Sequence, residues 1–126
     1  MNLVDSSGWL EYFADAPNAD FFAPAIEDFA NLLVSSINIY EVFKRILQQR
    51  NEYVAQQAVV LMMQGIIIDV SPSIAMHAAK LSDELKIPLA DSMILATARD
   101  NHAVVWTQDS DFKELEGVRY IEKQKG

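Results

Sequence analysis

An aspartate at the start of an apolar helix is the first candidate for chemistry in this sequence. Pro88 suits the first position of a helix, which needs no amide hydrogen, and residues 89–99 are mostly good helix formers. Asp91 lies in the first turn, and Ile94 and Leu95 follow it on the same face. A carboxylate on an apolar face is costly unless a cation or hydrogen-bond donors compensate it. The alternative is a rim acid that stabilises the positive end of the helix dipole.

A second group of acids follows a short apolar run. Residues 103–106 have the length and β-branched content of a buried strand, and they lead into Thr107, Asp109 and Asp111. Ligands collect beyond the carboxyl ends of strands in open α/β sheets. We therefore expect these acids to contribute to a site together with Asp91. A simple turn is the alternative, because Asp and Ser are favoured there.

Two more acids hold comparable places in the first third of the chain. Residues 2–4 predict a buried strand ending at Asp5, and Ser7 is predicted to cap the helix that follows. Glu41 lies near the start of a later helix, where Asn38 and Glu41 fit a capping box. Each acid thus has a structural alternative, Asp5 as a capping or turn residue and Glu41 as part of the capping box.

Four acids at strand ends and helix starts indicate a cation site. They are Asp5, Glu41, Asp91 and Asp109. Hard divalent ions such as Mg²⁺ and Mn²⁺ take oxygen ligands, and several carboxylates around one pocket would repel each other without such ions. Two-metal sites use this arrangement to activate a water and to stabilise the leaving oxygen of a phosphodiester. The acids alone do not prove nuclease chemistry.

Composition limits the class of protein. The chain of 126 residues is predicted to form a single domain, 1–126, and it contains no cysteine, which excludes disulfides and thiolate chemistry. No signal peptide or membrane span is visible, so we expect a cytoplasmic protein with no membrane partner. The net charge of −8 argues against a broad electrostatic grip on nucleic acid. Lys44, Arg45 and Arg50 are the best basic candidates beside an acid, although a solvated helix face explains them most simply.

Strands and helices alternate along the chain. Beyond the elements above, we expect short strands over 32–34, 66–70 and 118–121, with the last one at the sheet edge. We expect helices over 37–50, 51–64 and 73–85, and a helical turn over 113–117. This alternation predicts an α/β fold, with a mainly parallel sheet between two helical layers.

Four segments resemble the PIN-domain family, and most closely its VapC-type toxins of toxin–antitoxin systems. They are Leu-Val-Asp-Ser-Ser at 3–7, Ile-Tyr-Glu-Val at 39–42, Leu-Ala-Asp-Ser-Met-Ile-Leu-Ala-Thr-Ala at 89–98 and Val-Trp-Thr-Gln-Asp-Ser-Asp-Phe at 105–112. Each is weak alone, but together they span essentially the whole chain in order and at family-like spacing.

The resemblance implies a PIN-like three-layer α/β/α sandwich and a set of roles. Asp5, Glu41, Asp91 and Asp109 would be the catalytic, metal-binding acids, and Asp111 a possible fifth. Ser6 and Thr107 would supply hydroxyls that orient the acids or the phosphate. The implied reaction is Mg²⁺- or Mn²⁺-dependent hydrolysis of RNA by water. The implied partners are a cognate antitoxin, whose apolar helix would cover the aromatic amino-terminal half, and a second copy of the chain.

Other functions are open to the same residues. A PIN-like domain could bind metal or a protein partner without cutting RNA, although all four acids argue against this. A receiver domain fits poorly, because Asp69 lies inside its predicted strand and the late strand ends in Thr107 and Asp109 rather than lysine. A serine hydrolase fits less well still, since neither His77 nor His102 lies in a nucleophile context.

Overall fold

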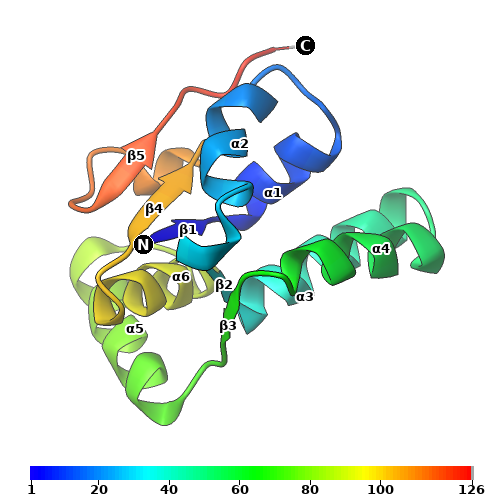
Figure 1. Ribbon diagram of the computed structural model, residues 1–126. Helices are drawn as coiled ribbons and strands as arrows, with labels where there is room; N and C mark the ends of the chain where they lie inside the picture. Colours follow the sequence, from blue (N-terminus) through cyan, green and yellow to red (C-terminus); the bar gives the residue numbers. More distant parts are fainter. Residues whose placement is uncertain (126) are drawn as a thin grey trace.

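The computed structural model describes residues 1–125 and has a five-stranded parallel sheet at its centre (Figure 1). The strands are β1 (Asn2–Val4), β2 (Leu32–Ser35), β3 (Ile66–Ile68), β4 (Val104–Thr107) and β5 (Val118–Tyr120). Their order is β3-β2-β1-β4-β5, so the chain moves outward from β1 on one side and then returns to its other side. All four neighbouring pairs are parallel. The predicted α/β fold is confirmed.

Six helices form the outer layers. They are α1 (Ser6–Phe13), α2 (Ala19–Ile26), α3 (Ser36–Gln49), α4 (Glu52–Met62), α5 (Pro72–Leu85) and α6 (Leu89–Asp100), with 3-10 turns at Phe29–Asn31 and Ser110–Phe112. Helices α5 and α6 lie together on one side, and α3 and α4 form a projecting hairpin (Figure 1). No helix within residues 1–125 combines the length and apolar character needed to cross a membrane.

Alternating strand residues divide the core into two halves. In the central strands, Val4 and Trp106 belong to the cluster formed with α1–α4, in which Trp9 is fully buried. Leu3 and Val105 point to the opposite face, into the cluster formed with α5 and α6. This is the period of two that a strand imposes. Both faces of the sheet are therefore covered, as a parallel sheet requires.

Three local predictions are wrong. Asp5 caps α1 in place of Ser7, because its carboxylate accepts the backbone N–H of Ser7. The helical turn expected at 113–117 lies earlier, at Ser110–Phe112, because the Asp109 side chain accepts the N–H of Asp111 and starts it there. The capping box of α3 joins Ser35 and Asn38 and does not include Glu41, a difference with consequences for the site.

Candidate metal centre

The pairing of β1 with β4 sets the position of the acids. Val4 pairs with Trp106, and the backbone N–H of Asp5 donates to the Trp106 carbonyl at 3.0 Å. Asp5 therefore directly follows β1 at the point where Thr107 ends β4. Strand order reverses between these two strands, which is where open α/β sheets form their binding crevices.

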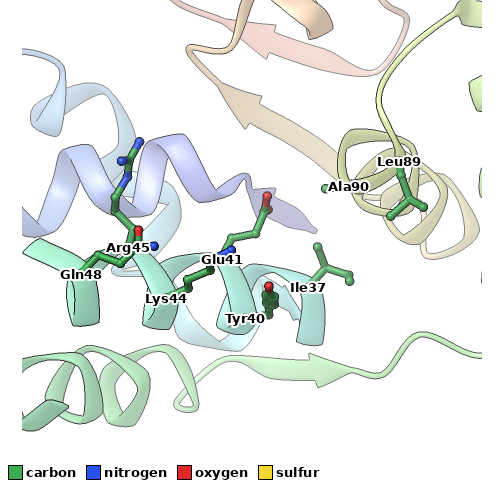
Figure 2. Close-up of a pocket in the computed structure, with 8 residues that line it drawn as sticks. All are labelled: Ile37, Tyr40, Glu41, Lys44, Arg45, Gln48, Leu89 and Ala90. Atoms are coloured by element: carbon green, nitrogen blue, oxygen red, sulfur yellow. The ribbon is translucent and has the colours of Figure 1, made fainter.

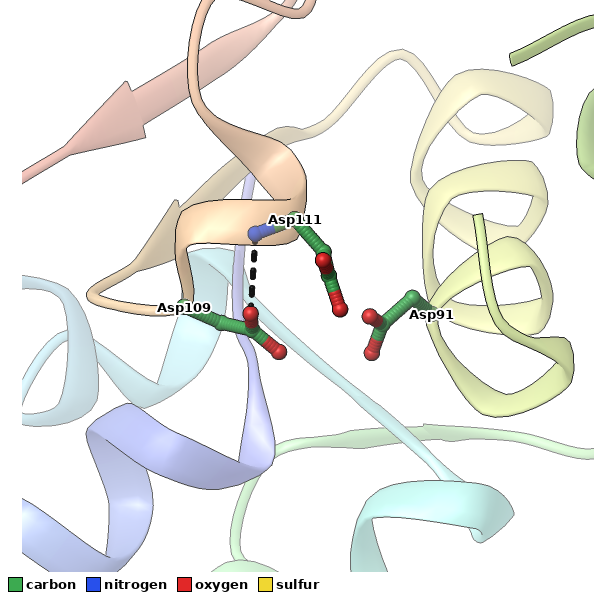
Figure 3. Close-up of side chains that lie close together, drawn as sticks. All are labelled: Asp91, Asp109 and Asp111. Atoms are coloured by element: carbon green, nitrogen blue, oxygen red, sulfur yellow. Dashed lines mark hydrogen bonds between the residues drawn. The ribbon is translucent and has the colours of Figure 1, made fainter. Parts of the chain in front are cut away.

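Three carboxylates converge beyond this edge of the sheet. One oxygen from each of Asp91, Asp109 and Asp111 lies within 4.8 Å of the others. Asp91 projects from the first turn of α6 toward the other two, which belong to the segment after β4 (Figure 3). Asp109 is held in place by the backbone N–H of Asp111, which donates to its Oδ1 at 2.9 Å. The structure thus brings together the predicted acids of helix and strand, and Asp111 lies with them.

Asp91 has a strongly perturbed ionisation. Burial is the largest cause, followed by the charges of Asp109 and Asp5, and together they raise its pKa to about 8. Asp111 acts in the same direction through a hydrogen bond and its charge. No Lys, Arg or His of residues 1–125 forms an ion pair with any of these acids. The negative charge gathered here has no side-chain counterion in the described part of the chain.

Asp5 is buried beside the three converging acids, close enough for its charge to act on Asp91. Burial raises its pKa to about 6, and the charge of Asp109 adds to this. Hydrogen bonds to its carboxylate oppose the rise: Thr107 donates to Oδ2, and Ser7 donates through its backbone N–H and, at 3.1 Å, through its hydroxyl. These donors stabilise the charged form that a cation would need.

Thr107 connects the acids of the two central strands. It is fully buried; its hydroxyl donates to Asp5 and accepts the backbone N–H of Asp109 at 2.9 Å. One hydroxyl therefore fixes both the orientation of Asp5 and the course of the chain at Asp109. Orientation of an acid or of the phosphate by Thr107 stays a prediction, and this hydrogen bond is the contact through which it would act.

Glu41 is not among the three converging carboxylates, but Ser6 links it to the segment that directly follows Asp5. The Ser6 hydroxyl donates to Glu41 Oε1 at 2.7 Å and accepts from Asn38 Nδ2 at 3.2 Å. Asn38 is fully buried, and its own Oδ1 accepts the backbone N–H of Ser35. The capping-box interpretation of Glu41 is thus wrong, since Asn38 takes that role. Asn38 was not among the residues predicted to support the site, although its spacing of three residues from Glu41 on one helix was a usable signal.

The donor set fits a hard divalent cation. Asp91, Asp109 and Asp111 offer only carboxylate oxygens, and the buried Asp5 adds a further negative charge beside them. Mg²⁺ and Mn²⁺ prefer such ligands. A bound cation would also offset the repulsion that raises the pKa of Asp91.

A groove opens next to the acids, between α3 and the start of α6 (Figure 2). Its volume is about 370 Å³. The residues that line it are Ile37, Tyr40, Glu41, Lys44, Arg45, Gln48, Leu89 and Ala90. Glu41 and Ala90, the residue before Asp91, both line it, so the groove lies between the two helices that carry these acids.

Comparison with protein families gives one match to this chain. A family model described as PIN domain matches residues 3–118. No curated protein sequence matches the chain at a significant level. The matched range includes part or all of every strand of the sheet, and it includes all five acids considered above.

Several solved structures share the fold. A toxin–antitoxin complex from Klebsiella pneumoniae contains a chain with 25% identity and a TM-score of 0.81, over 94% of this chain and 96% of that one. VapC20 from Mycobacterium tuberculosis, described as a sarcin-ricin loop cleaving toxin, has 16% identity and a TM-score of 0.76, over 94% and 97%. FitAcB from Neisseria gonorrhoeae has 20% identity and a TM-score of 0.73, over 97% of each chain.

Proposed function

The chain belongs to the PIN domain family, and from this membership we propose that it is a metal-dependent endoribonuclease that acts as the toxin of a toxin–antitoxin pair. The observation that carries the proposal is the convergence of Asp91, Asp109 and Asp111 beside the buried Asp5, with no side-chain counterion within residues 1–125. A metal-dependent nuclease needs such a cluster of carboxylates to hold its ions, whereas a domain that only packs against a partner gains nothing from this repulsion.

We assign roles to the residues around the centre. Asp5, Glu41, Asp91 and Asp109 would be the catalytic acids that hold Mg²⁺ or Mn²⁺, and Asp111 adds a carboxylate at the rim. When bound, the metal activates a water and stabilises the leaving oxygen of the phosphodiester. Other residues of the chain would hold the acids in position: Thr107 orients Asp5, and Ser6 orients Glu41.

The proposed antitoxin has an apolar groove available to it. A cavity of about 230 Å³ between α1 and α4 is lined by Phe13, Ile46, Val54, Gln57, Ala58 and Leu61. An amphipathic helix that inserts apolar side chains at helical spacing suits such a surface. The structural neighbours, which include toxin–antitoxin and VapBC complexes, support a partner of this kind.

We also propose a second copy of the chain as a partner, and a cytoplasmic location where cellular RNA is available. The dimer is supported by the open groove between α5 and α6, about 480 Å³ in volume, which is lined by small residues including Ala75, Ala79 and Ser82. Met76, 64% exposed, lies on the same helix. Small side chains allow a second copy to approach this groove closely.

The test is cleavage of total cellular RNA by purified, antitoxin-free protein, with Mg²⁺ or Mn²⁺ compared with EDTA. Asp91→Asn keeps the shape of the side chain and removes its charge. Asp69→Asn, at an exposed position beyond β3, is the matched control. We expect metal-dependent products from the parent and from the control, and none from Asp91→Asn.

Sequencing the RNA ends makes the assay sensitive to a nuclease that cuts at only one site. If no metal-dependent ends appear with the parent protein, the nuclease proposal fails, and a PIN domain that only binds metal or protein takes its place. If Asp91→Asn cuts as well as the parent, the assignment of the metal centre fails.

A further inference from the structure

The groove between α3 and α6 has features that the acid centre does not use. One wall is the exposed face of α3, which carries Tyr40, Lys44 and Arg45, and the other includes Leu89 at the start of α6 (Figure 2). Glu41 lines the first wall, and Ala90, the residue before Asp91, lines the second, so the groove runs between the two helices that carry these acids.

The two cations of the groove pair with no carboxylate in the described part of the chain. Lys44 and Arg45 are exposed, and neither forms an ion pair with any residue in 1–125, whereas Lys86 and Lys113 each lie within 4 Å of a carboxylate. Along this groove the two cations stand against one carboxylate, that of Glu41, in a chain whose net charge is −8. The excess of positive charge suits an anionic ligand.

The groove also presents a flat aromatic surface. Tyr40 is 53% exposed, and Leu89 across the groove is 68% exposed. The Lys44 ammonium lies 5.6 Å from the centre of the Tyr40 ring. An exposed ring beside cations is how proteins bind single-stranded nucleic acid, because bases stack on aromatic rings while Lys and Arg contact the phosphates.

A second hollow lies on the far side of Arg45. Its volume is about 240 Å³, and its lining residues are Ser7, Leu10, Glu11, Arg45, Gln49, Gln108 and Lys123. Ser7 contacts Asp5, and Gln108 precedes Asp109, so this hollow also adjoins the metal centre. The Glu11 carboxylate accepts from the backbone N–H of Asn18 and from Gln108 Nε2, which occupies both of its oxygens.

We propose that these two hollows are the substrate path of the proposed nuclease, with Arg45 between them as the shared phosphate contact. A single-stranded RNA segment lies along α3: Lys44 and Arg45 bind its phosphates, Tyr40 stacks on a base, and Lys123 binds the backbone beyond the scissile phosphate. The inference rests on the proposed function, and it names the residues that hold the substrate there. It also accounts for RNA binding by an acidic chain, since the positive charge need only follow one narrow path.

This substrate path is tested by measuring RNA binding under conditions that prevent cleavage. The probe is a fluorescein-labelled single-stranded RNA of 12 nucleotides and mixed sequence, measured by fluorescence anisotropy with the full chain in EDTA. The test variant is Lys44→Ala/Arg45→Ala. Lys80→Ala/Lys113→Ala is the control, because it removes the same charge from exposed positions that line neither hollow nor the proposed dimer groove.

The salt dependence of binding separates a local interaction from net charge. Removing one cation that binds a phosphate of single-stranded nucleic acid lowers the slope of log affinity against log salt by about 0.7, so the slope should fall by about 1.4 in the test variant and by close to nothing in the control. Tyr40→Ala should weaken binding by about 5- to 150-fold and keep the slope, and Tyr40→Phe should restore affinity. Thermal melting of each variant, all altered at exposed positions, verifies that the fold is retained.

Three results would overturn the path. The first is equal loss of affinity and slope in the test and control variants. The second is no RNA binding by the parent protein. The third is that the parent protein binds polyglutamate and not RNA, and that the test variant loses this binding. The groove would then hold an acidic protein segment. Failure of the proposed function is a separate result: RNA binding that depends on Lys44 and Arg45, without metal-dependent cleavage.

Discussion

The Ser6 hydroxyl donates a hydrogen bond of 2.7 Å to Glu41 Oε1, joining two residues that are 35 positions apart in the chain. Behind it, Asn38 donates to the same hydroxyl at 3.2 Å. Because Asn38 is also held by the backbone N–H of Ser35, at the start of α3, the orientation of Glu41 depends on the cap of its own helix.

The first prediction concerns this chain of hydrogen bonds. Ser6→Ala releases Glu41, and we expect kcat for RNA cleavage and Mg²⁺ affinity to fall by about 10- to 100-fold, as is typical when a group that orients a metal ligand is removed. The measurement is cleavage rate as a function of Mg²⁺ concentration. Ser73→Ala, at an exposed position of α5, is the control. Unchanged rates in Ser6→Ala would remove Glu41 from the site.

The second prediction concerns Thr107. Thr107→Val keeps the shape of the side chain but removes the donor to Asp5 and the acceptor for the Asp109 N–H. We expect the free energy of unfolding to fall by about 1–3 kcal/mol, because buried polar groups lose their partners. Thr107→Ser keeps the hydroxyl and should retain more of the stability. Urea unfolding measures both variants, and equal losses would show that the hydroxyl is not what matters.

The third prediction concerns pH in the absence of metal. The pKa of Asp91 is about 8 in the folded protein, against an ordinary value of 3.8. Between these two pH values the folded chain therefore retains a proton that the unfolded chain has already released. The resulting stability is complete below pH 3.8 and is lost as pH rises through 8. Asp5, with a pKa of about 6, acts in the same direction over the lower part of this window.

We therefore expect the Tm in EDTA to fall as pH rises from about 6 to about 8.5. Asp91→Asn removes the titrating group, and its Tm should fall less over the same range. Asp69→Asn has the same change of charge at an exposed position and should follow the parent. Superimposable profiles for the parent and Asp91→Asn would contradict the burial and repulsion assigned to Asp91.

The fourth prediction concerns metal addition. A ligand that binds only the folded state stabilises it by about 2.7 kcal/mol at one hundred times its Kd. Mn²⁺ should raise the Tm more at about pH 8 than at about pH 5.5, because protons compete with the cation for Asp91 and Asp5. The shift should be small in Asp109→Asn. A shift of the same size in that variant would place the ion elsewhere.

The elements of this fold were predictable because the buried strands are short apolar runs that end at polar residues. Asp5 and Thr107 follow such runs, and parallel pairing alone is enough to bring their ends to one edge. The position and hydrogen-bond partner of Glu41 were harder to predict from the sequence. Its spacing from Asn38 also fits a cap, and only the start of α3 at Ser36, one residue earlier than expected, gives Asn38 the capping position.

Interactions between distant elements left no local pattern in the sequence. The bond from Ser6 to Glu41 depends on how α1 packs against α3, and the closeness of Asp111 to Asp91 depends on where the turn after β4 begins. Lys44 and Arg45 look like an ordinary solvated face in the sequence. Their position beside a groove appears only when α6 is placed opposite α3.

The order β3-β2-β1-β4-β5 has a consequence for biosynthesis. A ribosome releases the amino-terminal half first, and that half carries Asp5 and Glu41 but none of the three converging acids. Until β4 emerges, β1 has no neighbour on one side, and Asp5 has no Thr107 to orient it. The translating ribosome, which contains RNA, therefore faces an incomplete form of the proposed nuclease centre for most of the time it spends making this protein.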